Sequence, residues 1–149
     1  MITELKRRAH SITPRRVVKS FSGVTTRAMK DYLKPNLELG PSEVILHGGT
    51  NDLRSRDPKE VAESIIDLAR QIESSCDAKV TISELVCRRG PLSEAVNTAN
   101  GHLTKFCRQN EWTLIRHQNI TVSGLNKGGL HLNYKGNDQF SKNFKSYLN

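Results

Sequence analysis

The sequence has few cysteines and no long apolar run, and each absence excludes a class of protein. Its three cysteines, Cys76, Cys87 and Cys107, form no Cys-x-x-Cys pair and no Cys/His cluster at zinc spacing, which argues against a disulfide framework and a metal site. No stretch approaches the roughly 18 consecutive apolar residues of a membrane span, and the amino terminus lacks the apolar core of a signal peptide. We therefore expect free thiols, no cofactor and no metal in an intracellular, cytoplasmic protein.

Acidic residues are scarce at the amino terminus, where Glu4 alone opposes eight basic residues among the first 30. This segment holds most of the net charge of +8. Such a patch can attract nucleic acid through phosphate contacts. No nucleic-acid motif or interleaved aromatic platform accompanies it, so a solvated basic surface is the simpler interpretation. An Arg-rich, acid-poor amino terminus also resembles a mitochondrial transit peptide weakly. The basic residues are Lys6, Arg7, Arg8, Arg15, Arg16, Lys19, Arg27 and Lys30.

Size and periodicity predict one domain in which helices and strands alternate. A chain of 149 residues with 36% hydrophobic residues suits a single domain, residues 1–149, around one core. Ile2, Leu5 and Ala9 stand at helical spacing and predict a first helix over Met1–Ala9. The other expected elements are a strand at Arg15–Ser20, a helix from Thr25 or Thr26 that Pro35 ends, a strand at Val44–His47, a helix after Asp57, a strand at Ala78–Ser83, a helix at Pro91–Gln109, a strand at Trp112–Arg116 and a helix from Asn133 or Gly136.

The helix after Asp57 has the strongest local signals. Asp57 is a capping residue, Pro58 occupies the first helical position, and Glu60 stands at the capping-box position. The apolar stripe that follows predicts one inward face, formed by Val61, Ile65, Leu68 and Ile72.

The alternation predicts a three-layer α/β/α sandwich with a mostly parallel, flavodoxin-like sheet. Ligands of such sheets bind at the carboxyl ends of the strands. Three loops fall there: the Ser22-Gly23 turn, the segment Gly48–Asp52 and the loop Gly128–His131. We therefore expect the functional site at this edge of the sheet.

These loops carry groups suited to acyl chemistry. The backbone N–H of Gly23 and the side-chain NH₂ of Asn51 can both point at developing negative charge, and His131 can transfer a proton. Each residue alone is weak evidence, since a glycine is usually only a turn and a histidine is usually structural. Their placement on successive strand ends is what indicates an oxyanion hole with a general base.

Three blocks resemble a known family. They resemble blocks of the SGNH (GDSL-like) hydrolases and occur along the chain in the order expected for that family: "SFSGVTT" (Ser20–Thr26), "GGTND" (Gly48–Asp52) and "GGLHLNYKG" (Gly128–Gly136). The chain is most similar to the esterase-like domains of animal retrotransposons. The resemblance implies the SGNH fold, Gly23 and Asn51 as oxyanion donors, His131 as general base, and Gly49 and Asp52 beside a small ester or acyl substrate.

The chain departs from this family in two places. The family's first block is a strand ending in Gly-Asp-Ser, which supplies the nucleophile, and "MITELKRR" looks like the segment after that serine, with Met1 directly following it. Gly128 stands where the family usually has the aspartate that orients the histidine. A dyad without that aspartate is expected to be less efficient.

We therefore expect the chain to derive from a longer active hydrolase. The missing first strand would lie between the strands at Arg15–Ser20 and Val44–His47, and its loss would leave two buried edges unpaired or force them together. Two functions stay open: an esterase or acyl hydrolase that is impaired here, or a non-catalytic module of the same fold that contacts nucleic acid. The oligomeric state stays open too.

No other residue is a convincing nucleophile or base. Ser22 and its neighbours Ser11 and Ser20 do not lie on a strand-to-helix turn. Cys87 ends a strand but has no local partner to lower its pKa, which favours a buried thiol. His47 is interpreted as a satisfied histidine at a strand end and Asp52 as a loop or cap carboxylate. No interpretable pattern surrounds His10, His102 and His117.

Overall fold

The computed structural model describes the backbone of residues 2–7 and 16–20 and all of residues 25–149. These residues form a five-stranded sheet in the order β2-β1-β3-β4-β5. β3, β4 and β5 pair in parallel, whereas β1 runs antiparallel to both of its neighbours. The strands are β1 (Ile2–Arg7), β2 (Arg16–Ser20), β3 (Pro41–His47), β4 (Lys79–Ser83) and β5 (Thr113–Ile115).

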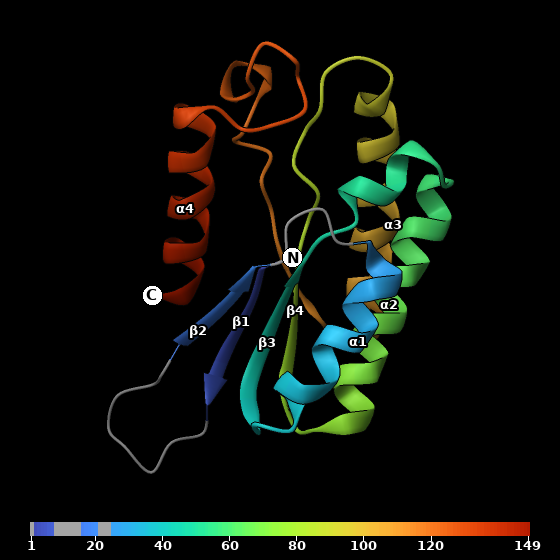
Figure 1. The fold of residues 1–149 in the computed structure, drawn as a ribbon, viewed down its shortest axis with the longest axis vertical. Helices are drawn as coiled ribbons and strands as arrows, with labels where there is room; N and C mark the ends of the chain where they lie inside the picture. The colour runs from blue at the N-terminus through green and yellow to red at the C-terminus, as the bar shows by residue number, and fades with distance from the viewer. Residues whose placement is uncertain (1, 8–15, 21–24) are drawn as a thin grey trace.

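Helices cover both faces of this sheet, which confirms the three-layer α/β/α architecture. Figure 1 shows α1, α2 and α3 together on one side and α4 on the other. Two short 3₁₀ helices, η1 and η2, lie in the loops after β3 and β5. The helices are α1 (Thr26–Leu37), η1 (Thr50–Arg54), α2 (Pro58–Ser75), α3 (Leu92–Asn110), η2 (Val122–Gly124) and α4 (Tyr134–Leu148).

The helix predicted over Met1–Ala9 is wrong, because Ile2–Arg7 form β1. β1 occupies the slot between β2 and β3 in which we expected no strand. Its register pairs Ile2 with Ser20 on one side and with His47 on the other. The open backbone groups of two neighbouring strands need partners, and satisfying both outweighs a helical spacing of three apolar residues. The slot is therefore filled, but by a strand of reversed direction.

Pro35 does not end its helix as predicted, because α1 continues to Leu37. A proline in the last turn removes only one hydrogen bond of the helical ladder. The side-chain amide of Asn36 donates to the carbonyl oxygen of Tyr32 at 2.7 Å and supports that turn. The start of α1 is as expected, since the Thr25 hydroxyl accepts from the Ala28 N–H.

The helix predicted after Asp57 is confirmed. The Asp57 carboxylate accepts from the Lys59 N–H at 2.8 Å, and Pro58 begins α2. The predicted stripe on α2 is buried against the sheet, as apolar burial on one helix face requires. The largest fully buried side chains of the core include Met29, Leu33, Leu46, Ile66, Ile72, Ile82, Leu85 and Leu103.

A buried carboxylate joins α4 to the sheet on the opposite side from this core. Glu43 on β3 is 6% exposed and accepts hydrogen bonds from the hydroxyls of Thr81 and Tyr147. The Lys79 ammonium lies 3.9 Å from the same carboxylate and compensates its charge. The carboxyl-terminal half of α4 is thereby held by a polar contact rather than by apolar packing alone.

The amino-terminal end of α4 depends on a contact between two glycines. A Cβ on Gly136 would stand 2.1 Å from the carbonyl oxygen of Gly124. We expect Gly136→Ala to lower the free energy of unfolding by about 1–3 kcal/mol, as overpacking against a rigid neighbour does. Urea unfolding measures this change.

Gly101→Ala is the matched control for this substitution. Gly101 lies exposed within α3, and a Cβ there meets no atom within 4 Å. Alanine should therefore stabilise the chain by up to about 1 kcal/mol through helix propensity. Equal effects of the two substitutions would contradict the close contact at Gly136.

Candidate active site

The segment after β3 is shaped by a glycine in a left-handed conformation. Gly49 has a φ of 102°, and a Cβ there would lie 2.9 Å from Cδ1 of Ile65. The chain can therefore turn from β3 into η1 while staying packed on α2 only if this residue is glycine. The turn exposes Asn51, one residue into η1.

Asp52, the next residue, points into the protein instead. It is 5% exposed, and its Oδ2 accepts from the backbone N–H of Thr26 at 2.9 Å. Thr26 is the first residue of α1, so Asp52 satisfies an N–H that the helix itself leaves unpaired. The negative charge also lies near the positive end of the α1 dipole. The interpretation of Asp52 as a carboxylate that supports the loop is thereby given a specific partner.

His131 lies exposed in the loop before α4. Its carbonyl oxygen accepts from the Asn126 N–H at 2.8 Å, and the Arg89 N–H donates to Gly129 at 3.0 Å. The first bond closes the loop on itself, and the second holds it against the segment that follows β4. Within residues 25–149, the His131 imidazole makes no hydrogen bond or ion pair, which agrees with glycine at position 128.

The structure thus places two of the three predicted chemical groups in loops at one edge of the sheet. Asn51 follows β3, and His131 belongs to the loop between β5 and α4. The loop after β4 is hydrogen-bonded to the loop that contains His131. The predicted oxyanion donor Gly23 and the alternative serine Ser22 lie outside the described residues. The same holds for the side chains of the basic patch before residue 25.

Sequence reasoning missed a hydrogen-bonded chain at this strand edge. Ser83 ends β4, and its Oγ lies 2.9 Å from Nδ1 of His47 and 2.6 Å from Nε2 of His117. The other nitrogen of His117 lies 2.9 Å from the side-chain nitrogen of Asn143 on α4. His47 and Ser83 are the last residues of β3 and β4, and His117 lies just after the end of β5. That common position is the signal that could have found them.

The direction of these hydrogen bonds follows from Asn143. Its oxygen accepts from Asn119 and Gln139, and its NH₂ donates to Asn119 and to Nδ1 of His117. Nδ1 of His117 is therefore the acceptor, and Nε2 carries the proton and donates to Ser83. The Ser83 hydroxyl then donates to Nδ1 of His47. Each of these hydrogen bonds then has one donor and one acceptor while His47 and His117 are both neutral.

Phenyl rings close this chain from the side of α4. The ring centroid of Phe140 lies 4.9 Å from that of His47 and 4.8 Å from that of His117, and Phe144 packs against Phe140. Ser83 and His117 are each only 2% exposed. The serine–histidine pair therefore has the distances of a catalytic dyad but is enclosed by protein, and it positions the strand ends.

Burial shifts the pKa of the titratable groups at this edge. It lowers the pKa of His47 to about 3, with the nearby His117 adding to the effect, and it lowers the pKa of His117 to about 4. Burial also raises the pKa of the Cys87 thiol. A thiol that resists ionisation is a poor nucleophile. The sequence predicted a buried thiol at Cys87, whereas the structure shows Cys87 only half-buried. The described cysteines are all free.

Solved structures resemble this chain, whereas no protein-family model and no curated protein sequence matches it. A GDSL-like lipase from Bacteroides thetaiotaomicron superposes with a TM-score of 0.72 at 16% identity, over 87% of this chain and 73% of the lipase. The chain has the SGNH hydrolase fold. A catalytic mutant of an acetylxylan esterase from Geobacillus stearothermophilus has a TM-score of 0.74 at 15% identity and covers 89% and 72%. The psychrotrophic esterase EstA from Pseudoalteromonas has a TM-score of 0.65 at 21% identity, and the match covers 85% of this chain and 74% of EstA.

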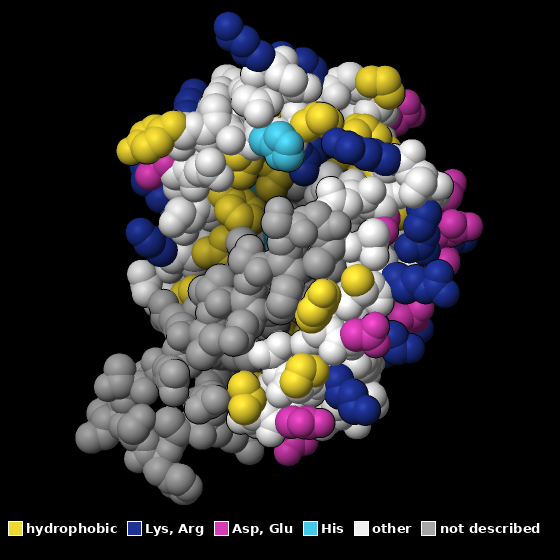
Figure 2. All heavy atoms as spheres, in the orientation of Figure 1, with side chains coloured by type: hydrophobic (Ala, Val, Ile, Leu, Met, Phe, Trp, Pro, Cys, Tyr) yellow, Lys and Arg dark blue, Asp and Glu magenta, His cyan; other side chains and the backbone are white. Residues whose placement is uncertain are grey.

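Across the described side chains, no group of three or more His, Cys, Asp or Glu residues is arranged to hold a metal ion. None of the described helices combines the length and apolarity needed to span a bilayer. On the face shown in Figure 2, basic and acidic side chains alternate over α1 to α3, so no field of one sign covers that layer there.

Removing the Asp52 carboxylate should destabilise the fold. Asp52→Ala leaves the buried Thr26 N–H without its acceptor, which we expect to lower the free energy of unfolding by about 1–3 kcal/mol. Asp31→Ala, an exposed change on α1, should stay within about 0.5 kcal/mol. Chemical denaturation compares the two variants. Equal losses would show that the carboxylate–helix bond does not hold η1.

The free energy of unfolding should also decrease as the pH is lowered below 6.5. The unfolded chain protonates these histidines near 6.5, whereas the folded network keeps His117 neutral down to about 4. The unfolded state binds more protons between those values, so the stability present above pH 6.5 is lost as the pH falls toward 4. Urea unfolding at several pH values measures the slope. His117→Gln should make it shallower, and an unchanged slope would contradict the neutral network.

Proposed function

We propose that this chain is an ester-binding domain of the SGNH hydrolase fold whose hydrolytic activity is strongly impaired. The substrate is a small ester or acetyl group at the edge formed by the loops after β3 and β5. Asn51 donates its side-chain NH₂ to the carbonyl oxygen, with Gly23 as a second donor, and His131 acts as the base. Solved structures of this fold include lipases and esterases, which supports the substrate class.

The exposure of Asn51 and His131 supports these roles. Gly49 and Asp52 fix the loop on both sides of Asn51, one through its backbone conformation and the other through its bond to Thr26. The anchored loop leaves the Asn51 side chain in contact with solvent. An amide donor held in advance stabilises a developing oxyanion without reorganising. His131 is exposed as well and can accept a proton from a nucleophile that approaches from solvent.

The direction of β1 is the observation that carries the impairment. A nucleophile at this edge belongs on the turn that follows the carboxyl end of a strand pointing toward it. β1 runs the other way, with Ile2 beside His47 and Arg7 beside Pro41 at the far end of β3. Arg7, at the carboxyl end of β1, therefore lies at the opposite end of β3 from Asn51. Among the residues whose side chains are described, Ser83 supplies a hydroxyl at the end of a strand pointing to this edge, and it is enclosed and bonded to two histidines.

Since none of the side chains from residue 25 onward supplies an accessible serine nucleophile at this edge, the route we propose is attack by water. His131 would take a proton from water, the oxygen of that water would bond to the ester carbonyl carbon, and Asn51 would donate to the resulting oxyanion. Collapse of the intermediate would expel the alcohol with a proton returned by His131. This route lacks an orienting carboxylate on the histidine and a covalent intermediate, so we expect it to be slow.

Hydrolysis of p-nitrophenyl acetate by the purified chain tests this proposal. We expect turnover below about 0.01 s⁻¹, roughly a thousandth of a typical kcat, and no initial burst of p-nitrophenol. Any rate above buffer should fall in His131→Ala and Asn51→Ala. His102→Ala, a change on α3, is the control and should keep that rate. A burst equal to the enzyme concentration would reveal a covalent nucleophile and overturn the impairment.

Binding is measured separately so that weak turnover does not decide the whole proposal. Titration with methyl acetate should shift the side-chain NH₂ signal of Asn51 in a ¹H–¹⁵N NMR spectrum. Circular dichroism confirms that each variant is folded. A folded chain with neither turnover nor a change at Asn51 would exclude an ester-binding function for this edge.

A further inference from the structure

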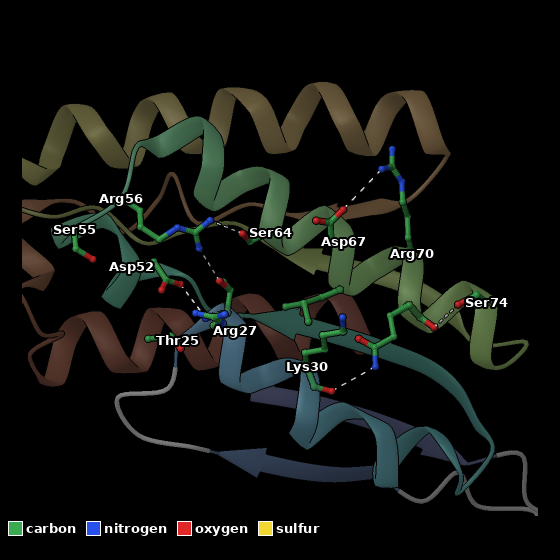
Figure 3. Close-up of a pocket in the computed structure, with 13 residues that line it drawn as sticks. Thr25, Arg27, Lys30, Asp52, Ser55, Arg56, Ser64, Asp67, Arg70 and Ser74 are labelled. Atoms are coloured by element: carbon green, nitrogen blue, oxygen red, sulfur yellow. Dashed lines mark hydrogen bonds and ion pairs between the residues drawn. The ribbon is translucent and has the colours of Figure 1, made fainter.

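A groove between α1 and α2 begins at Asp52, beside the loop that carries Asn51, and extends along both helices. It has a volume of about 960 Å³, within the usual range for small-molecule sites. Figure 3 shows side chains from α1, from the segment after η1 and from α2 pointing into it. The residues that matter for its chemistry are Arg27, Lys30, Arg56, Ser64, Asp67 and Gln71.

Positive charge in this groove is not balanced by the carboxylates around it. Asp52 at one end is occupied by the Thr26 N–H, and Asp67 lies 3.9 Å from Arg70. Arg27 and Lys30 form no ion pair with any described residue, and neither does Arg56. Three cations without a carboxylate partner therefore line one concave surface, in contrast to the mixed charges over the helices around it.

Arg56 is held in place by neutral groups only. Its guanidinium donates to the Thr26 hydroxyl at 3.3 Å and to the Ser64 hydroxyl at 2.8 Å (Figure 3). It also donates to the Glu60 carbonyl oxygen at 3.3 Å. A guanidinium has five N–H donors, so two remain for a ligand. A partly buried cation fixed by neutral acceptors keeps its full charge for an incoming anion.

The groove also contains a hydrogen-bond acceptor that has no donor, one turn of α1 away from the contact between Arg56 and Thr26. The side-chain oxygen of Gln71 is buried and has no hydrogen-bond partner among the described residues. The nitrogen of the same amide donates to the Lys30 carbonyl oxygen at 3.4 Å, which fixes which atom is left over. A buried acceptor of this kind is costly unless a donor reaches it. The groove therefore offers cations for an anion and an acceptor for a hydroxyl.

The spacing of these two features defines the ligand. Arg56 contacts Thr26 and Gln71 contacts Lys30, four residues further along α1. That separation is about 6 Å along a helix axis, comparable to the distance between the phosphate and the hydroxyls of a small polyol phosphate. The dianionic phosphate matches the excess of positive charge. The helix N–H groups of Thr26 and Ala28 are already bonded, so the site does not depend on them.

We propose that this groove binds a phosphate monoester of a small polyhydroxylated molecule. The phosphate lies against the Arg56 guanidinium with Arg27 and Lys30 completing its charge, and a ligand hydroxyl donates to the side-chain oxygen of Gln71.

Isothermal titration calorimetry with glycerol 3-phosphate tests the site, with inorganic phosphate and glycerol as separate probes. Glycerol 3-phosphate should bind at least about tenfold more tightly than either probe, since each good interaction of about 1.4 kcal/mol gives a factor of ten. Arg56→Gln and the double change Arg27→Gln with Lys30→Gln should each weaken binding about tenfold or more. Lys34→Gln, an exposed change on α1 outside the groove, should leave it unchanged.

Gln71→Leu separates the two halves of the proposal. It should weaken the binding of glycerol 3-phosphate and leave the binding of inorganic phosphate unaffected, because only glycerol 3-phosphate has a carbon-bound hydroxyl that can reach Gln71 while its phosphate lies at Arg56. The double change on α1 removes no hydrogen bond between side chains, so it remains informative if Arg56→Gln unfolds. Equal weakening by Lys34→Gln would show diffuse attraction to a basic surface and overturn the site. So would equal affinity for glycerol 3-phosphate and inorganic phosphate.

Discussion

The sheet depends on filling the slot between β2 and β3. Each of these strands presents a row of N–H and C=O groups toward it, and no helix layer can satisfy those groups. β1 satisfies both rows, but only in the antiparallel direction. The strand order β2-β1-β3-β4-β5 follows from that pairing.

The same pairing separates the architecture of the site from its chemistry. The loops at the strand edge are held by contacts that do not involve β1: Asp52 bonds to α1, and the loop with His131 bonds to the segment after β4. The edge can therefore keep the form of the proposed ester-binding site while β1 points away from it. This is why we place binding and catalysis in separate experiments.

How much could be predicted from the sequence depended on the range of each signal. Asp57, Pro58 and the stripe on α2 are local signals, and that helix was predicted correctly. The segment Ile2–Arg7 has a weak helical spacing that long-range pairing overrode, and no local rule could reveal it. Pro35 was misread because its effect depends on how much helix remains after it. The network at Ser83 joins β3, β4, β5 and α4, and His117 carries no motif of its own.

The one-way order of that network has a consequence for long-distance communication. Once the orientation of the Asn143 amide is fixed, each following hydrogen bond has only one possible direction. The bonds can therefore change direction only together. Gln139 and Asn119 on the outer side settle the amide of Asn143, and through it the proton position on His117, the Ser83 hydroxyl and finally His47 on β3. A surface amide on α4 thereby selects the tautomer of an imidazole two residues before Gly49. One chain of hydrogen bonds thereby joins α4 to the strand end beside Gly49.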